Sequence, residues 1–267
     1  MAAASSGLKD YLEGLYARHQ RAELISPDPL QFVRAKDVSD REIEALVASS
    51  LAYGRVAMIL RSVGTVLSSL GKSPRAAVEG TSLDEWRERF SGFKHRFTDG
   101  DDVAHLLFGV RCVVEEFGSM QACLLRGRGE SGSLVGGLEF LVRSLSRGRE
   151  NSLFALPSKG SACKRHFLML RWLVRCDAVD PGGWSGVNPS ELLVPLDVHM
   201  YQVCGSIGFT SRKSADLKTA REITSHFARL CPNDPVKYDF VLTRFGIRPD
   251  MRQSDVIEEA NRAIHNS

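Results

Sequence analysis

Apolar residues recur along most of the chain at the three- and four-residue spacing of amphipathic helices. The clearest case is the stretch 101–117, in which six apolar residues share one face: Val103, Leu106, Leu107, Val110, Val114 and Phe117. No stretch alternates apolar and polar residues with the β-branched enrichment of a strand. The pattern therefore predicts an all-α protein of ten or eleven helices with no sheet. The other main helices are expected over 8–23, 39–51, 56–70, 138–145, 163–175, 216–230, 234–245 and 254–264.

Capping residues and glycines predict where several of these helices begin and end. Ser39 is expected to cap the second helix, with Glu42 as its capping-box partner. Asp234 is expected to cap a later helix that has Pro235 at its first position. Two stretches are predicted outside helices: a short disordered lead at 1–7 and a flexible basic loop at 126–132.

The composition is that of an ordinary globular protein. The 267 residues are 43% hydrophobic and 25% charged, and the formal net charge of +3 does not by itself indicate nucleic acid. No apolar run approaches the length of a membrane span, and the N-terminus lacks the pattern of a signal peptide. We expect a cytoplasmic protein that forms one unit of two helical lobes, with a boundary near 148–157.

The segment 156–208 carries the candidate chemistry. A turn at 156–162 leads into an apolar helix that Lys164 opens, and a second helix follows at Asp197. An amine nucleophile and a carboxylate at neighbouring helix starts are what lysine-based imine chemistry requires. Two simpler roles stay open at this point: Lys164 as a surface lysine whose stem packs on the helix, and Asp197 as an N-cap.

Other polar residues around this segment have two interpretations each. Gly160 and Ser161 precede a helix N-terminus, which favours an anion, but Ser161 is equally suited to capping. His199 could contact a phosphate or serve as a structural hydrogen-bonding group. The arginines at 143, 147 and 149 could be a solvated face. The six cysteines form no Cys-x-x-Cys pair and no histidines have metal-ligand spacing, so we expect no metal and no cofactor.

Two resemblances sharpen this interpretation. Residues 194–201, Val-Pro-Leu-Asp-Val-His-Met-Tyr, resemble the aspartate segment of the helix-hairpin-helix DNA glycosylases, especially the 8-oxoguanine branch. The Leu-Pro-Ser-Lys-Gly stretch at 156–160 is similar to the Leu-Pro-Gly-x-Gly hairpin that precedes the catalytic lysine in that superfamily. Residues 40–70, with Leu-Ala-Tyr-Gly at their centre, are similar to the helix pair that inserts a residue into the duplex. Residues 160–175 and 234–240 resemble segments of a widespread uncharacterised bacterial family, DUF2400. The resemblance to this family covers most of the chain.

The sequence departs from the glycosylase pattern in three ways. Ser158 replaces the first glycine of the hairpin, where the superfamily has a carbonyl site for a monovalent cation, and two extra residues precede Lys164. Lys164 and Asp197 are 33 positions apart (197 − 164), more than is usual in the superfamily. The additional length is the loop 177–190, which is either a simple insertion or a sign that the two residues do not meet.

The glycosylase resemblance implies a nucleoid-associated base-excision enzyme that acts as a monomer on double-stranded DNA, with 8-oxoguanine as the first expected substrate. It leaves open whether the enzyme is monofunctional or also has AP-lyase activity. Lys164 would attack the sugar of a flipped nucleotide and Asp197 would stabilise the developing charge. The phosphate grip would be formed by Lys159, Gly160, Ser161, Arg165 and His199, while Tyr53 or Arg55 would fill the hole or read the opposite base. Trp184, Tyr238 and Phe240 would stack on the flipped base or, as aromatic residues more often do, belong to the core. Asp239 would bond the edge of the base. A non-catalytic helix-hairpin-helix DNA-binding protein and a helical interaction protein remain as alternatives.

Overall fold

The computed structural model describes residues 2–265, and this part of the chain is mostly helical, as predicted. It contains thirteen α-helices, five short 3₁₀ turns and one two-stranded hairpin, so the expected number of helices was too low and the absence of strands was wrong. The first eight helices are α1 (Ala2–His19), α2 (Val38–Ser50), α3 (Val56–Leu70), α4 (Pro74–Gly80), α5 (Leu83–Arg89), α6 (Gly100–Phe117), α7 (Met120–Ser131) and α8 (Leu134–Ser146). The remaining five are α9 (Lys164–Val174), α10 (Val198–Ser206), α11 (Leu217–Leu230), α12 (Asp239–Ile247) and α13 (Gln253–His265).

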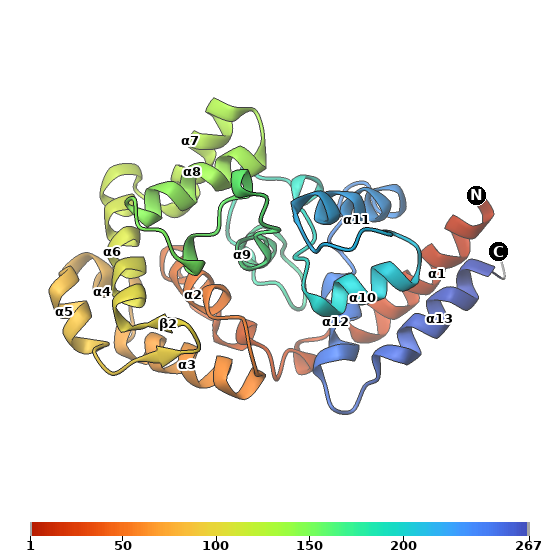
Figure 1. Cartoon of the computed structure of the whole chain (residues 1–267), viewed down its shortest axis with the longest axis horizontal. Helices are drawn as coiled ribbons and strands as arrows, with labels where there is room; N and C mark the ends of the chain where they lie inside the picture. Colours follow the sequence, from red (N-terminus) through yellow and green to blue (C-terminus); the bar gives the residue numbers. More distant parts are fainter. Residues whose placement is uncertain (1, 266–267) are drawn as a thin grey trace.

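The helices form two groups with α9 between them. Figure 1 shows α2 to α8 on one side of α9 and α10 to α13 on the other, and α1 joins the second group. Helices α1 and α13 pack against each other, so the two ends of the described chain lie side by side. No helix of the described chain is long and apolar enough to cross a membrane.

Helix α9 is the centre of the core, as its apolar surface predicted. Phe167, Leu170 and Trp172 are completely buried, and they belong to one continuous cluster of buried apolar residues. Burying a side chain of the size of Phe167 contributes about 2 to 3 kcal/mol. A helix held this firmly on several sides gives the residues at its first turn fixed positions.

The stretch 126–132, expected as a flexible loop, lies mostly in α7. Its glycines and arginines suggested a loop, but Gly127 lies within the helix. A glycine is required there because α7 and α8 approach closely: a Cβ atom would lie 2.2 Å from the Cβ of Phe140. Ser119 caps the start of α7 by accepting a hydrogen bond from the N–H of Ala122, and Gly132 ends it in the left-handed conformation. The glycine therefore serves packing rather than flexibility.

Three predicted helix starts were also wrong. Asp37, not Ser39, caps α2, and the intended capping partner Glu42 is buried. The stretch 234–238 forms turns, and α12 begins only at Asp239. Residues 2–7, expected as a disordered lead, form the first turns of α1.

The hairpin that the sequence did not predict consists of β1 (Lys94–His95) and β2 (Thr98–Asp99), paired antiparallel. Arg96 takes the left-handed conformation with a φ of 55°, and Phe97 completes the two-residue turn. Each strand has only two residues, too few for an alternating pattern to be recognised.

Candidate functional site

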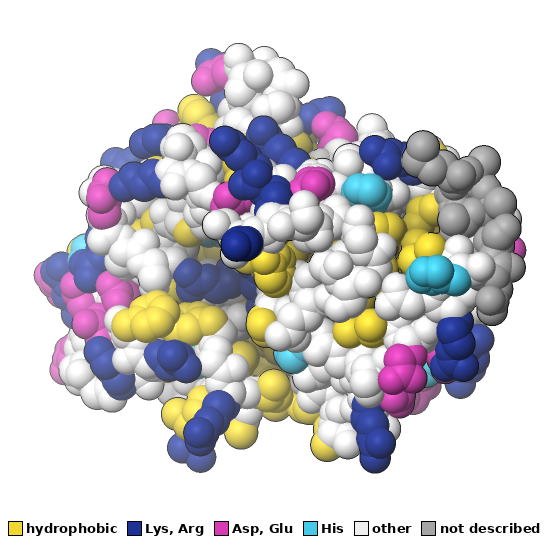
Figure 2. Space-filling view, turned by 45° about the vertical axis from the view of Figure 1, so that its right-hand side comes forward, with side chains coloured by type: hydrophobic (Ala, Val, Ile, Leu, Met, Phe, Trp, Pro, Cys, Tyr) yellow, Lys and Arg dark blue, Asp and Glu magenta, His cyan; other side chains and the backbone are white. Residues whose placement is uncertain are grey.

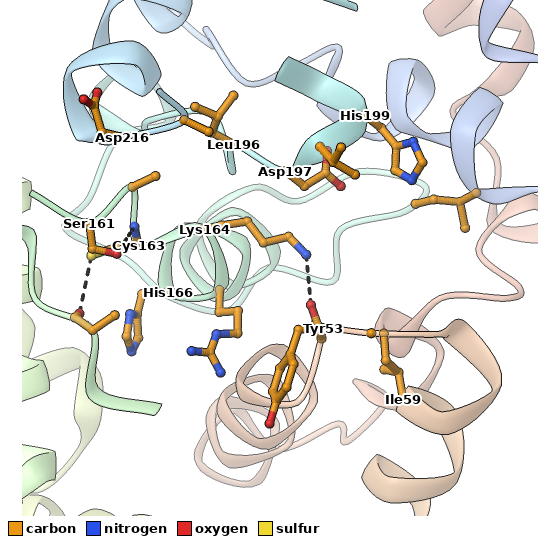
Figure 3. A pocket seen from close by; sticks show the side chains of 18 of the residues that line it. Tyr53, Ile59, Ser161, Cys163, Lys164, His166, Leu196, Asp197, His199 and Asp216 are labelled. Carbon is orange, nitrogen blue, oxygen red and sulfur yellow. Dashed lines mark hydrogen bonds between the residues drawn. The ribbon is translucent and has the colours of Figure 1, made fainter. Parts of the chain in front are cut away.

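A cavity of about 560 Å³ opens beside the first turn of α9, and we refer to it as the site cavity. Its walls come from separate parts of the chain: the α2–α3 connection, the turn before α9, the start of α10 and the start of α11. Seven of the site residues predicted from the sequence line it: Tyr53, Gly160, Ser161, Lys164, Arg165, Asp197 and His199. Figure 3 shows Lys164 and Asp197 facing the same space from different helices.

Lys164 is the first residue of α9, as the sequence predicted. The preceding residue, Cys163, has a φ of 47° and makes no side-chain cap, so the chain turns sharply into the helix there. The half-buried Lys164 side chain extends across the cavity, and its Nζ donates a hydrogen bond of 3.0 Å to the carbonyl oxygen of Ala52 (Figure 3). The amine is therefore held at one position between the two groups of helices.

Asp197 caps α10 and also faces the site cavity. One carboxylate oxygen accepts a hydrogen bond of 2.8 Å from the N–H of Met200, which leaves the half-buried carboxylate with capacity for further partners. Capping and a role in the cavity are thus compatible in this geometry.

The long loop 177–190 does not separate Lys164 from Asp197. It runs along the far part of α9, where Gly182 and Trp184 donate backbone hydrogen bonds to the carbonyl oxygens of Trp172 and Leu173. Asp180 in this loop is fully buried against Arg171 and Arg175. The loop packs along the C-terminal part of α9 and leaves Lys164 and Asp197 on the same cavity.

Two histidines line the site cavity in different surroundings. His166 is buried, and this burial lowers its pKa to about 4, so it is neutral at pH 7. The ring of His199 lies against Gly246, where an added Cβ would be 2.1 Å from its Nδ1, and this Nδ1 has no hydrogen-bond partner. His199 was predicted as a site residue, whereas His166 was not.

Arg165 and Tyr53 are bound to each other and to the surrounding backbone. The Arg165 guanidinium lies 4.9 Å from the centre of the Tyr53 ring and donates to the carbonyl oxygens of Ser50 and Ser152. The Tyr53 hydroxyl donates to the His95 carbonyl at 2.9 Å and contacts the Thr98 hydroxyl at 2.7 Å. These contacts fix the wall of the site cavity that faces the hairpin.

The turn 156–162 is a 3₁₀ turn, Pro157–Lys159, that ends at Gly160 in the left-handed conformation. The Gly160 carbonyl accepts a hydrogen bond from the N–H of Leu217, which ties the turn to the start of α11. Ser161 does not cap α9, because its hydroxyl accepts from the N–H of Cys163 instead. Asp216, which sequence reasoning missed as a site residue, caps α11 and lines the site cavity beside this turn, where it forms an antiparallel bridge with Ser161.

Lys159 lies outside the site cavity. It lines a second cavity of about 480 Å³ together with Arg143 and Arg149, and we refer to this one as the basic cavity. All three side chains are paired: Lys159 with Glu150 at 2.8 Å, Arg143 with Glu139 and Arg149 with Asp101 and Asp102.

The residues expected to stack on a base lie elsewhere in the described structure. Trp184 is buried and donates to Glu42 at 3.1 Å, while Tyr238 is buried and bonded to Glu13 at 2.7 Å. Phe240 is buried between the guanidinium groups of Arg171 and Arg244. None of the three is among the residues lining the site cavity.

Asp239 is connected to the site by a smaller inner cavity of about 80 Å³, which Lys164 and Asp197 also line. One of its carboxylate oxygens pairs with Arg171, and the other, Oδ1, has no hydrogen-bond partner. Burial is the main reason why its pKa is raised to about 6, and the charges of Asp197 and Asp180 add to the effect while Arg171 opposes it.

Arg55, the remaining predicted contact, is exposed and precedes α3 next to Gly54, which lines the site cavity. Among the described residues, no group of three or more His, Cys, Asp or Glu side chains could hold a metal ion.

Comparison with known proteins places this arrangement in a family. A family model described as "Protein of unknown function (DUF2400)" matches residues 28–248, which include every residue that lines the site cavity. The chain belongs to the DUF2400 family. Neither the search of curated proteins nor the search of solved structures returned a match. The family assignment therefore covers the site but carries no activity with it.

Proposed function

We propose that this DUF2400 protein is a DNA glycosylase that excises a damaged base through an imine on Lys164. Its two groups of helices would then correspond to the lobes of a helix-hairpin-helix glycosylase, with the site cavity as the cleft between them. The observation that carries the proposal is that Lys164 and Asp197 open two different helices and line one cavity. 8-Oxoguanine is the first candidate substrate.

In the proposed reaction the unprotonated Nζ of Lys164 attacks C1′ of a nucleotide flipped into the site cavity. The bond from C1′ to the base breaks, and the base leaves with the electron pair and takes up a proton. Opening of the sugar ring then gives an imine between Nζ and C1′. Loss of a C2′ proton expels the 3′ phosphate and nicks the strand, which is the AP-lyase step.

Two neighbouring groups support this chemistry. The Ala52 carbonyl holds the Lys164 amine in the cavity, so little conformational freedom is lost when a nucleotide arrives. The Asp197 carboxylate is placed to stabilise the positive charge that develops on the sugar. His199 and the Gly160–Ser161 backbone would contact phosphates of the duplex. The protein would bind DNA of the nucleoid as a monomer.

Borohydride trapping tests the proposal directly, because an imine is reducible. We expect wild-type protein to form a covalent adduct with a duplex that contains 8-oxoguanine, uracil or an abasic site. Lys164→Gln should abolish the adduct and strand cleavage, since the amide keeps a donor for Ala52 but cannot form an imine. Lys159→Gln is the matched control and should retain trapping, because this exposed lysine lies outside the site cavity.

Two outcomes would contradict this assignment. An adduct that persists in Lys164→Gln would move the nucleophile to another amine. No adduct of the wild type with any of the three duplexes would favour the non-catalytic DNA-binding alternative, for which the existing hydrogen bond of Lys164 and the capping role of Asp197 would be sufficient.

Asp197→Asn separates capping from catalysis. Asn caps helices as well as Asp does, so α10 should keep its start and thermal unfolding should change little. The lost negative charge should lower the rate of base excision by roughly 100-fold or more, the effect of one preorganised electrostatic group. If the rate is retained, Asp197 is only a cap.

A further inference from the structure

Phe97 is the most exposed large apolar side chain of the described residues, with 59% of its surface accessible. It sits in the turn between β1 and β2 and stacks on Tyr53, with ring centres 4.8 Å apart and planes inclined by only 17°. A ring on the surface of a protein normally hides its faces. Here one face is covered by Tyr53 and the rest of the ring is presented to solvent.

The ring is held rigidly although it is exposed. Tyr53 is stacked under Phe97, its hydroxyl is bonded to the hairpin backbone, and Arg165 lies against its ring. His95 packs edge-on against the same tyrosine. Because Tyr53 also lines the site cavity, the hairpin and its Phe97 are fixed at the edge of that cavity.

Three cations lie on the hairpin and at the start of α3, and one of them, Lys94, is the cross-strand neighbour of Asp99 without an ion pair between the two. Arg55, Lys94 and Arg96 are all exposed, and the ion pairs of the described residues include none of the three. The stem of Arg96 lies against Gly54, where an added Cβ would be 2.8 Å from its Cδ, so this charge is also at the cavity edge. Figure 2 shows Lys and Arg side chains on several sides of a hollowed region in which hydrophobic side chains are visible.

We propose that the β1–β2 hairpin binds DNA by stacking Phe97 on a base of the duplex beside the nucleotide in the site cavity. Arg55, Lys94 and Arg96 bind the phosphates on either side of that base. This inference rests on the proposed function, since it takes DNA as the ligand. It assigns the insertion into the duplex to a hairpin residue, in place of Tyr53, whose hydroxyl and ring are already engaged.

The chemistry of the surface favours a nucleic acid over a protein partner. A single rigid aromatic ring among three unpaired cations offers one stacking face and little apolar area. In a nucleic acid the bases supply stacking faces and the backbone supplies the anions. A protein partner would need a larger apolar surface to bind stably.

The test uses a duplex with a stable abasic-site analogue and 2-aminopurine next to it, so that no cleavage is required. We expect wild-type protein to raise the 2-aminopurine fluorescence, because insertion of Phe97 separates that base from its neighbour in the duplex. Phe97→Ala should remove the fluorescence change and weaken binding about tenfold, the effect of one lost base–aromatic stack. Phe97→Trp should retain both, whereas Phe97→Leu should behave like Phe97→Ala. Met58→Ala, which removes another exposed apolar side chain, is the control and should bind like the wild type.

Charge reversal tests the cations in the same assay. Arg96→Glu should weaken binding on every duplex, whereas Lys72→Glu should not, because this exposed lysine follows the far end of α3, a helix roughly 22 Å long that begins next to Arg55. Thermal unfolding of each variant confirms that the fold is intact.

The outcomes separate this inference from the proposed function. If Phe97→Ala binds the duplex and raises the 2-aminopurine fluorescence as the wild type does, the stacking role is overturned, even if borohydride trapping succeeds. Wild-type protein that gives the fluorescence change but no borohydride adduct supports the hairpin and contradicts the glycosylase. A wild type that binds no duplex overturns the hairpin proposal.

Discussion

The charges buried under α9 and the charges exposed on the hairpin differ in whether they have partners. Arg171 and Arg175 are buried, and each pairs with Asp180; Arg171 also pairs with Asp239. Arg55 and Arg96 are exposed and enter no ion pair of the described residues. A charge that folding has already neutralised holds the structure together, whereas an unneutralised charge at a cavity edge is available to a ligand.

The basic cavity is an intermediate case. Its cations Arg143, Arg149 and Lys159 are accessible, but each is paired with a carboxylate on the protein surface. Such exposed pairs contribute little to stability and can be exchanged for other partners. The three regions therefore predict three kinds of response to substitution, from loss of folding to small changes in affinity.

The largest effect is expected in the buried network. Asp180→Asn removes the carboxylate that Arg171 and Arg175 share and leaves two buried cations underpaired. We expect a loss of about 3 to 5 kcal/mol in the free energy of unfolding, measured by urea denaturation. The control Asp84→Asn, in an exposed pair with Arg87, should change this free energy very little. Equal stability of the two variants would contradict the structural role of the network.

Acid should destabilise the fold through His166. Burial holds the pKa of this histidine at about 4 in the folded protein, below the ordinary value near 6.5 of an unfolded chain. Its contribution is therefore fully present above pH 6.5 and is lost as the pH falls through 4. The shift of the pKa from 6.5 to about 4 corresponds to a loss of about 3 kcal/mol in the free energy of unfolding when the pH falls from above 6.5 to below 4. His166→Gln, compared with the wild type by denaturation at pH 7 and pH 4.5, should flatten this part of the pH dependence, and an unchanged slope would contradict it.

The buried network also shows what sequence patterns could and could not predict. The periodicity of α9 predicted its burial and its start at Lys164, although no side chain caps this helix. The start of α10 was predicted correctly because Asp197 is a local capping signal. The pairing of Arg171 with Asp239 was not predictable, because it joins positions 68 residues apart. The composition of 126–132 also led to the wrong prediction of a loop, because it does not show that Gly127 packs against Phe140 of the neighbouring helix.

The surface was harder to predict for a related reason. Lys159 was expected to grip phosphates because it lies in the turn before Lys164, but charge alone does not reveal that Glu150 faces it. The hairpin with Phe97 escaped prediction because two-residue strands show no periodicity. Residue type indicates which groups could contact a ligand, whereas tertiary contacts decide which of them are unpaired.

Unpaired and paired cations should differ in DNA affinity. Arg55→Ala should weaken duplex binding several-fold and lower the slope of log affinity against log salt by about one, the signature of one lost phosphate contact. Lys159→Ala should have a smaller effect on both, because Glu150 already neutralises part of its charge. Fluorescence anisotropy over a range of salt concentrations measures both quantities. A larger effect of Lys159→Ala would reverse the order of the two regions.

The smallest effect should come from releasing Lys159. Glu150→Gln removes its carboxylate partner without altering the lysine, so the charge becomes available at the edge of the basic cavity. If DNA passes over this cavity, binding should strengthen by about twofold at low salt, and the gain should disappear at high salt because it is purely electrostatic. The double variant Glu150→Gln with Lys159→Ala should lose the gain, which separates release of Lys159 from the general loss of a negative charge. An equal gain in the single and the double variant would show that Glu150 only repels DNA and that Lys159 does not contact it.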